Sequence, residues 1–443
     1  MHSRVRLGRK LTNRSFPAIQ GFPNVKLLSG YVIPISLKAF ADTIGKSVMF
    51  IITIVAARQL NPDPFAILAL AMATGWLLGV ATDCGLSMHL ARETARDRVR
   101  SRKLLFEVIG LRTGLAFVAA TLVVFATPRL VPGHWRIQFI VIVLAQLAGA
   151  VIDTVAHYFR GLQRSEIEAA IHTAQRVVTL IWALIVLWLW RRLDYLGVAM
   201  LVPAVGAMLI AILVAARIST NDRAPDNTPA LTPSIFFSDV FPLGAATLIS
   251  ALYFRIDVYF IQEWHGFQPV GGYNAAFRLI EALRLLPAAV MAVTFPLLVR
   301  ATDTQHVRKI GAALTAIGAA LAIVCAAGGS WIVPAVYGDG YAYAAPAFSI
   351  LALALPLFFL NYALTHQVIG WDGQRAYLVI VTVALAANIA ANVAFIPSQG
   401  ITGAAVATVL TEIIVTIGCL AFFYLRAEPS RRAAVMNERV ELS

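Results

Sequence analysis

Charged residues are scarce in this chain. They make up 13% of its 443 residues, whereas hydrophobic residues make up 59%. Soluble globular domains carry about 25% charged residues, so this scarcity excludes an ordinary soluble protein. The long apolar runs agree, because about 20 helical residues cross a hydrocarbon core of about 30 Å. We expect an all-α polytopic membrane protein with about 12 transmembrane helices, at residues 35–57, 65–88, 104–127, 137–159, 169–190, 195–216, 239–263, 270–298, 310–334, 343–367, 376–396 and 402–425.

Cysteine is also rare, and the motifs of several enzyme classes are missing. Cys84, Cys325 and Cys419 all lie inside expected spans, which predicts buried free thiols and no disulfide framework. The sequence contains no Walker loop, no His or Cys cluster at metal-ligand spacing and no Asp-x-Asp pair, which excludes ATPases and most metal-dependent glycosyltransferases. We therefore expect no enzymatic activity, no cofactor and no bound metal.

The chain has a net charge of +13, and its distribution indicates the kind of partner. If the N-terminus is cytoplasmic, about two thirds of the Lys and Arg residues fall on the cytoplasmic side, as the positive-inside rule requires. The basic balance therefore predicts membrane topology and no nucleic-acid partner, with both termini in the cytoplasm. Residues 1–33 are basic without the apolar core of a cleavable signal peptide, so we expect none.

One polar segment divides the chain. The stretch "RISTNDRAPDNTPALTP" follows the sixth expected span, and the sequences on its two sides resemble each other weakly: "HYFRGLQR" parallels "HQVIGWDGQR". Such a repeat predicts two pseudo-symmetric six-helix lobes with a binding site between them. The expected organisation is a basic N-terminus (1–33), an N-lobe (34–217), a linker (218–233), a C-lobe (234–425) and a cytoplasmic tail (426–443).

Several charged residues lie deep inside expected spans, where each costs about 2.5–3.5 kcal/mol on insertion scales. Those near the cytoplasmic span ends, Lys38, Arg112 and Arg176, are explained by snorkelling. The deeper set comprises four cations (Lys46, Arg255, Arg278 and Arg284) and three acids (Asp42, Asp257 and Glu281). One interpretation is a set of salt bridges that fix helix register. Because the cations outnumber the acids, we favour a wetted cationic cavity for an anionic ligand. Arginine suits phosphate through its planar donor fork.

The stretch "YFRIDVYFIQEW" places two of these charges close together. Arg255 and Asp257 are roughly 200° apart around a regular helix, so they cannot pair with each other. The face of Arg255 is the more polar one. We therefore expect Arg255 to face the cavity and Asp257 to turn into the lobe, where it would neutralise Arg278 or Arg284.

Four weaker features have structural interpretations. Gly75 and Gly79 predict a close helix contact. Asp83 is expected to cap a helix or to pair with the arginine-rich loop that follows it. Asp153 and His157, four residues apart, predict a satisfied polar pair, with a proton relay as the alternative. Glu412 is a further candidate for a coupling acid.

The order and spacing of five stretches resemble one known family. They are "AARQLNPDPFAILALA", "ATDCGLSMHLARETAR", "RIDVYFIQEWHGFQPVGGYNAAFRLIEALRLLPAAV", "VYGDGYAYAAPAFSILALALPLFF" and "NVAFIPSQGITGAAVATVLTE". From about residue 30 to 425 the chain resembles the polysaccharide (O-antigen and exopolysaccharide) flippases of the multidrug/oligosaccharidyl-lipid/polysaccharide exporter superfamily, which are MATE-like. Twelve spans differ from the fourteen of the peptidoglycan-precursor flippases, and a basic cavity differs from the acidic pockets of the drug antiporters.

The resemblance implies a V-shaped, alternating-access flippase in the bacterial inner membrane. Its substrate would be an undecaprenyl-diphosphate-linked oligosaccharide, and its partners would be membrane lipids, a polysaccharide polymerase and co-assembly proteins. The resemblance also implies a ligand-binding role for Lys46, Arg255, Arg278 and Arg284, with Asp42, Asp257 and Glu281 in coupling or charge pairing. The alternatives are a proton- or sodium-coupled small-molecule exporter and a membrane-embedded polymerase or ligase.

Overall fold

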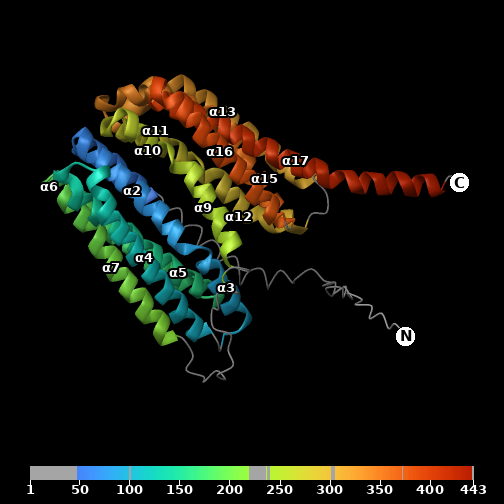
Figure 1. Cartoon of the computed structure of the whole chain (residues 1–443), viewed down its shortest axis with the longest axis horizontal. Helices are drawn as coiled ribbons and strands as arrows, with labels where there is room; N and C mark the ends of the chain where they lie inside the picture. The colour runs from blue at the N-terminus through green and yellow to red at the C-terminus, as the bar shows by residue number, and fades with distance from the viewer. Residues whose placement is uncertain are drawn as a thin grey trace, which may run out of the picture.

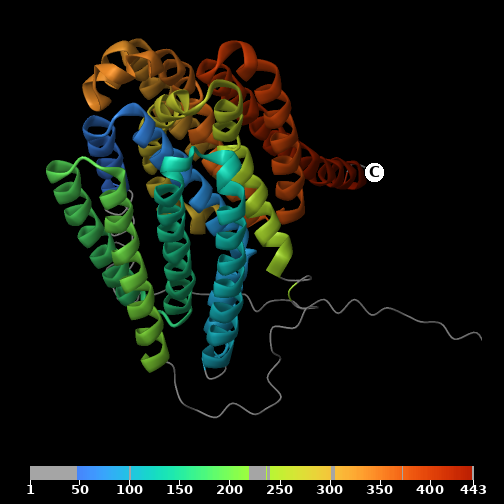
Figure 2. The same cartoon turned by 60° about the vertical axis from the view of Figure 1, so that its left-hand side comes forward.

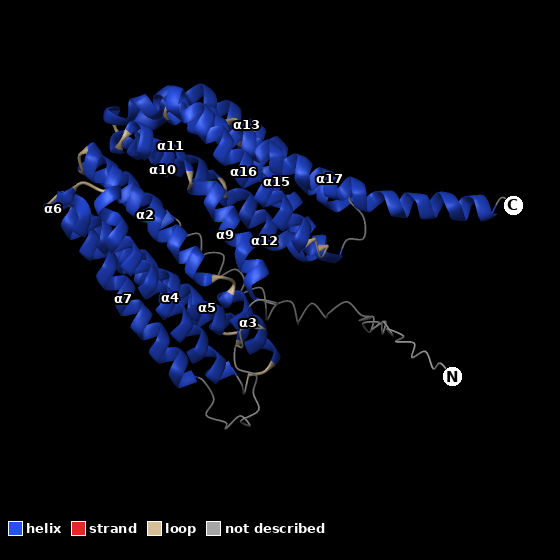
Figure 3. Ribbon diagram, viewed as in Figure 1, coloured by secondary structure: helices blue, strands red, loops and turns tan. Residues whose placement is uncertain are grey.

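The computed structural model describes residues 47–98, 101–218, 236, 240–300, 305–371 and 373–441. Within these ranges all regular structure is helical and no strand occurs (Figure 3). The all-α prediction is therefore confirmed.

A first group of helices precedes the undescribed residues 219–235. It begins with the short apolar helix Ser47–Gln59 and continues with α2 (Pro62–Asp83), α3 (Leu86–Arg96), α4 (Ser101–Leu130), η1 (Gly133–Trp135), α5 (Arg136–Gly161), α6 (Ser165–Leu189) and α7 (Leu193–Ile218). Helix α5 packs against α2, α4 and α7, and is the centre of the group. Its buried residues include Phe139, Val143 and Val155.

A second group follows. It contains α9 (Phe241–Arg255), α10 (Asp257–His265), α11 (Phe267–Leu283), α12 (Leu285–Arg300), α13 (Gln305–Tyr337), η3 (Asp339–Ala344), α14 (Ala345–Ala352), α15 (Leu355–Gly370), α16 (Gln374–Gln399) and α17 (Ile401–Glu441). The closest pairs are α16 with α17 and α13 with α15. Figures 1 and 2 show the two groups as arms that meet where α2, α10 and α11 lie together and separate toward their other ends.

Close packing seals the end where the arms meet. A Cβ on Gly271 of α11 would lie 3.3 Å from Phe65 Cδ1 of α2, and the rings of Phe65 and Tyr341 stand edge to face at 5.4 Å. Arg58 donates from its Nε to the Val336 carbonyl at 2.7 Å, at the C-terminal end of α13. Helix C-termini leave carbonyls without partners inside the helix, so an arginine from the other arm satisfies one here.

Several helices are broken near the middle of the molecule. Between α2 and α3, Cys84 and Gly85 adopt φ of 45° and 87°, a left-handed conformation that favours glycine. This turn presses against the start of α9, since a Cβ on Gly244 would lie only 2.1 Å from the Cys84 carbonyl carbon. Further breaks at Ile256 and Arg284 separate α9 from α10 and α11 from α12.

Within the described residues, nine helices are long and apolar enough to cross a membrane, or ten if η3–α14 and α15, bent by 45°, form one span. The chain is thus a multi-pass membrane protein. The predicted total of 12 is not reached, and the shortfall has two sources. Only 47–59 of the first expected span is described, and the expected span 270–298 is split at Arg284 into α11 and α12.

Candidate ligand-binding cavity

A cavity of about 890 Å³ lies between the two arms. Its walls come from α2, α4, α5 and α6 on one side and from α9, α11 and α15 on the other, with the helix Ser47–Gln59 also contributing. The residues of α2 that line the cavity run from Met72 to Asp83, the last residue of the helix. The basic segment 92–103 follows a few residues later. The volume of the cavity is in the range of about 300–1,000 Å³ that is typical of small-molecule sites.

The second arm contributes three arginines and one glutamate to this cavity, here called the arginine cluster: Arg255, Arg278, Glu281 and Arg284. The Glu281 carboxylate joins two of the arginines, because its Oε2 accepts from Arg255 Nη2 at 3.1 Å and from Arg278 Nη1 at 2.8 Å. Arg255 comes from the end of α9, and Glu281 and Arg278 lie three residues apart on α11. The cluster therefore carries more positive than negative charge.

Aromatic rings hold two of these arginines in place. The Arg284 guanidinium lies 4.4 Å from the centre of the Phe254 ring and 4.3 Å from that of Phe358. The Arg255 guanidinium lies 4.6 Å from the Phe277 ring centre. Cation–π contacts of this kind fix a guanidinium without using its N–H donors.

Several N–H donors of the arginine cluster consequently have no hydrogen-bond partner among the described residues. Within the described part of the chain, Arg255 Nη1, Arg278 Nε and both Nε and Nη1 of Arg284 are buried and make no hydrogen bond. A buried polar group without a partner costs about 1–3 kcal/mol, more when it is charged. Phosphate matches the donor fork of arginine, and an anionic ligand that reached these covered donors would satisfy them.

Asp257 is not among the residues that line the cavity, and it is 2% exposed. It accepts hydrogen bonds from the Tyr273 hydroxyl and from the Val258 N–H, the latter at 2.8 Å. The hydroxyl groups of Tyr273 and Thr408 lie 3.2 Å apart. The expected pairing of Asp257 with Arg278 or Arg284 is wrong, because Arg278 pairs with Glu281 and Arg284 packs against aromatic rings.

Four other residues that the sequence singled out are not part of the described cavity. Lys46 and Asp42 lie outside the described residues, as does Lys38. Glu412 is 3% exposed and is not among the residues that line the cavity. Its carboxylate accepts from Asn361 Nδ2 at 2.7 Å, within the second arm.

Arg112 lines the opposite wall and was missed as a cavity residue. It is 3% exposed, so the snorkelling explanation is wrong. Its Nη2 donates to the Gly79 carbonyl of α2 at 2.7 Å, and its Nη1 lies 3.6 Å from Asp83 Oδ1. A Cβ on Gly79 would lie 3.2 Å from the Ala150 Cβ, so the small residue lets α2 and α5 approach around the arginine. The glycine spacing was the available signal for this site.

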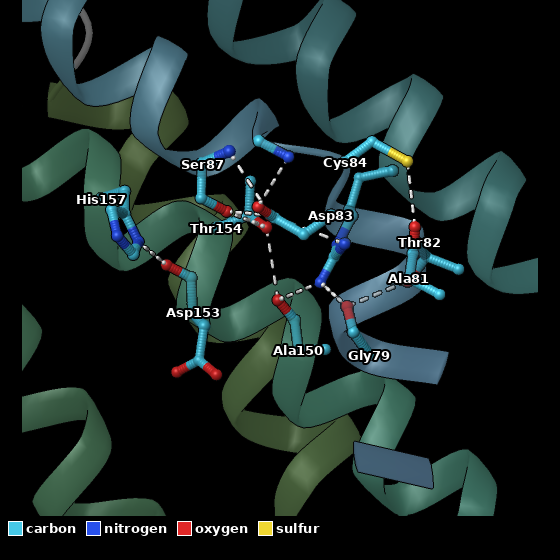
Figure 4. A network of polar contacts seen from close by, with 12 residues as sticks. Gly79, Ala81, Thr82, Asp83, Cys84, Ser87, Ala150, Asp153, Thr154 and His157 are labelled. Atoms are coloured by element: carbon cyan, nitrogen blue, oxygen red, sulfur yellow. Dashed lines mark hydrogen bonds and ion pairs between the residues drawn. The ribbon is translucent and has the colours of Figure 1, made fainter. Parts of the chain in front are cut away.

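Asp83 and its neighbours form a hydrogen-bonded network (Figure 4), and Arg112 lies beside it with its Nη1 3.6 Å from Asp83 Oδ1. The Asp83 carboxylate accepts from the Gly85 N–H at 3.2 Å and the Ser87 N–H at 3.3 Å, and so caps the start of α3. The capping role expected for Asp83 is present, while its ionic partner is Arg112 rather than the loop. Ser87 Oγ lies 3.1 Å from Thr154 Oγ1, which ties α3 to α5.

Asp153 and His157 do not form the expected side-chain pair. His157 Nδ1 lies 2.8 Å from the Asp153 main-chain oxygen, and Figure 4 shows the Asp153 carboxylate pointing away from the His157 ring. That carboxylate lies 3.5 Å from His172 Nε2 of α6, a partner that the spacing within α5 could not reveal.

The two walls thus differ in charge. The first arm contributes two aspartates and two arginines (Asp83, Asp153, Arg112 and Arg176), here called the balanced wall. The arginine cluster opposite has three arginines for one glutamate. Among the described residues no group of three or more His, Cys, Asp or Glu side chains could hold a metal ion.

Comparison with known proteins identifies the family. The model of the family described as "polysaccharide biosynthesis protein" matches residues 35–302, more than half of the chain. The chain belongs to this family. No curated protein sequence matches it.

Solved structures share the fold. The lipid II flippase MurJ, in an inward closed conformation, has a TM-score of 0.65 at 13% identity, over 87% of this chain and 86% of that one. An inward-facing multidrug resistance MATE transporter has a TM-score of 0.63 at 13% identity, over 87% of this chain and 96% of that one. A transporter of the same superfamily from Pyrococcus furiosus is described as having a binding pocket of reverse polarity. It has a TM-score of 0.61 at 15% identity, over 89% of this chain and 95% of that one. The chain therefore has the fold of these transporters.

Proposed function

We propose that the chain is an alternating-access flippase. It would move a polyprenyl-diphosphate-linked oligosaccharide across the bacterial inner membrane for the synthesis of surface polysaccharide or exopolysaccharide. The observation that carries the proposal is the arginine cluster, a cationic site with unsatisfied donors in a cavity between two helical arms. Family membership supports the connection with polysaccharide biosynthesis.

In this proposal the arms correspond to an N-lobe (34–217) and a C-lobe (234–425), joined by the linker 218–233, and both termini are cytoplasmic. The cavity admits the diphosphate head group from the cytoplasmic side, while the polyprenyl tail stays in the lipid between the arms. Rocking of the lobes then exposes the site to the periplasm. The sealed end around Phe65 and Gly271 would have to open in that step.

The arginine cluster supplies the binding chemistry. Arg255 and Arg278 share one carboxylate oxygen of Glu281, so a phosphate can take over one of them without leaving Glu281 unpaired. Arg284 lies between two aromatic rings, and its Nε and Nη1 are buried donors that a phosphate could satisfy once the covering side chains move. Lys46 and Asp42 are proposed to add to the site from the first span. A polymerase and co-assembly proteins are proposed partners.

The binding role of Arg255 is tested by Arg255→Gln and Arg255→Glu in a strain that depends on this gene for polymer export. We expect export to fall at least tenfold with membrane levels unchanged for Arg255→Gln, because one charge-assisted contact to phosphate is worth about 1.5–3 kcal/mol. Arg176→Gln, on the balanced wall, is the matched control. Undiminished export at normal membrane levels would remove the binding role.

A proton- or sodium-coupled exporter of small molecules is the alternative that shares this fold. Deletion of the gene separates the two: a flippase predicts lipid-linked repeat units that accumulate facing the cytoplasm, whereas an exporter predicts drug sensitivity with intact surface polysaccharide. A membrane-embedded polymerase or ligase predicts that the repeat units accumulate facing the periplasm.

A further inference from the structure

The balanced wall presents a large aromatic side chain to the cavity. Trp76 of α2 lines the cavity and is 41% exposed, although it lies in the middle of a helix whose other residues are mostly buried. Its indole takes part in no hydrogen bond within the described chain. Exposed indole area in a cavity open to water is an unfavourable arrangement unless a ligand covers it.

A single aromatic ring, that of Phe254, connects Trp76 to the arginine cluster. The centres of the Trp76 and Phe254 rings are 6.3 Å apart, and Phe254 is the ring against which the Arg284 guanidinium packs at 4.4 Å. Trp76 belongs to the first arm and Phe254 to the second. A group attached directly to a phosphate on the cluster would therefore meet the Trp76 ring.

Uncharged amides lie on the same wall. Gln146 of α5 packs over Gly75, the residue before Trp76, since a Cβ on Gly75 would lie 2.6 Å from Gln146 Cβ. Its side-chain amide lines the cavity and makes no hydrogen bond within the described chain. Gln175 of α6 also lines the cavity and donates to Thr179 Oγ1 at 3.3 Å. An amide both donates and accepts, which suits the hydroxyl groups of a sugar.

The charges of the balanced wall do not favour an anion. Arg112 has Asp83 at 3.6 Å, and Asp153, with 64% of its side-chain surface exposed, lines the cavity with its carboxylate 3.5 Å from His172 Nε2. A planar aromatic ring beside neutral amides, without excess charge, is suited to a neutral ring that has one apolar face and hydroxyl groups at its edge.

We infer that the balanced wall is a sugar subsite for an uncharged pyranose: the Trp76 ring stacks on the apolar face of the sugar next to the diphosphate, and Gln146 and Gln175 bond its hydroxyl groups. This inference rests on the proposed function and divides the ligand between the walls, with the diphosphate on the arginine cluster and the first sugar on the balanced wall.

Two probes separate the subsites when they are titrated into the full-length chain in lipid nanodiscs. The first is polyprenyl diphosphate, and the second is the same lipid carrying one neutral hexose. We expect the hexose to improve binding by the wild type about tenfold. Trp76→Ala should remove this gain and leave the affinity for the sugarless lipid unchanged. Trp76→Phe, which keeps a ring, should retain most of it.

Binding of the sugarless lipid reports whether each variant is folded, and Trp188→Ala is the matched control, because Trp188 is 75% exposed and lies outside the cavity. The inference is overturned if the hexose adds nothing to wild-type binding, or if Trp76→Ala weakens both probes equally. Failure of the wild type to bind either probe would instead contradict the proposed function.

Discussion

The two walls of the cavity use arginine in different ways. On the balanced wall, Arg112 is tied to the Gly79 carbonyl and faces Asp83, and so connects α2 and α4. In the arginine cluster, Arg284 is held by aromatic rings and keeps two N–H donors unsatisfied. The comparison teaches that burial alone does not identify a ligand-binding arginine. Among the described residues, Arg112 and Arg284 each have two buried N–H donors without a hydrogen bond, so unsatisfied donors do not distinguish them either. The two sites differ in what holds the guanidinium, a main-chain carbonyl and an aspartate for Arg112 but aromatic rings for Arg284, and in the net charge of the wall.

Arg112→Met should give the largest loss of stability among substitutions on the two walls. It removes the bond to Gly79 and the cation beside Asp83; breaking a buried ion pair by removing one partner costs about 3–5 kcal/mol, and because Asp83 is 26% exposed we expect a loss at the lower end of this range. We expect low membrane abundance and a much lower Tm for the purified chain. Abundance at the wild-type level, combined with lost binding of polyprenyl diphosphate, would mean that Arg112 is a ligand contact and that the walls do not differ as described.

Glu281→Gln should increase the difference in charge between the two walls, because it makes the arginine cluster more positive. The substitution removes the acid that joins Arg255 and Arg278, so we expect polyprenyl diphosphate to bind about tenfold more tightly and to be transported more slowly because its release is slower. Binding titrations and a flipping assay in proteoliposomes would measure both. If Tm falls while affinity stays the same, Glu281 only stabilises the fold.

Of the three substitutions, Asp257→Asn should have the smallest effect on stability and transport. Asp257 lies outside the cavity, and an amide keeps the hydrogen bond from Tyr273, so the loss is part of one charged hydrogen bond, about 1–2 kcal/mol. We expect a lower Tm with unchanged transport per folded molecule, and a similar result for Tyr273→Phe. Loss of transport at normal Tm and abundance would instead give Asp257 a part in coupling.

The sequence predicts the regular spans well. The expected spans 104–127, 137–159 and 376–396 lie within α4, α5 and α16, because an apolar run flanked by polar residues defines a membrane helix almost by itself. The helical wheel also separates Arg255 from Asp257 correctly, because Ile256, at the break between α9 and α10, still has helical dihedral angles, φ −67° and ψ −25°.

The features that the sequence did not predict depend on contacts between distant segments of the chain, and hydropathy does not report such contacts. The role of Arg112 requires α2 and α5 to meet at Gly79, and the partner of Asp153 is on another helix. The turn at Gly85 is fixed by its contact with α9. The split at Arg284 places a charged residue at a helix break, where a plot of apolar residues indicates one long span.

The most direct test of the account measures the affinity of purified chain for polyprenyl diphosphate at low and high salt, for the wild type, Arg255→Gln and Arg176→Gln. Both arginines line the same cavity, one on each wall. We expect Arg255→Gln to bind at least tenfold more weakly and to show a smaller dependence on salt, while Arg176→Gln stays within about twofold of the wild type. Equal losses for the two variants would contradict it, because the head group would then not be bound by the arginine cluster in particular.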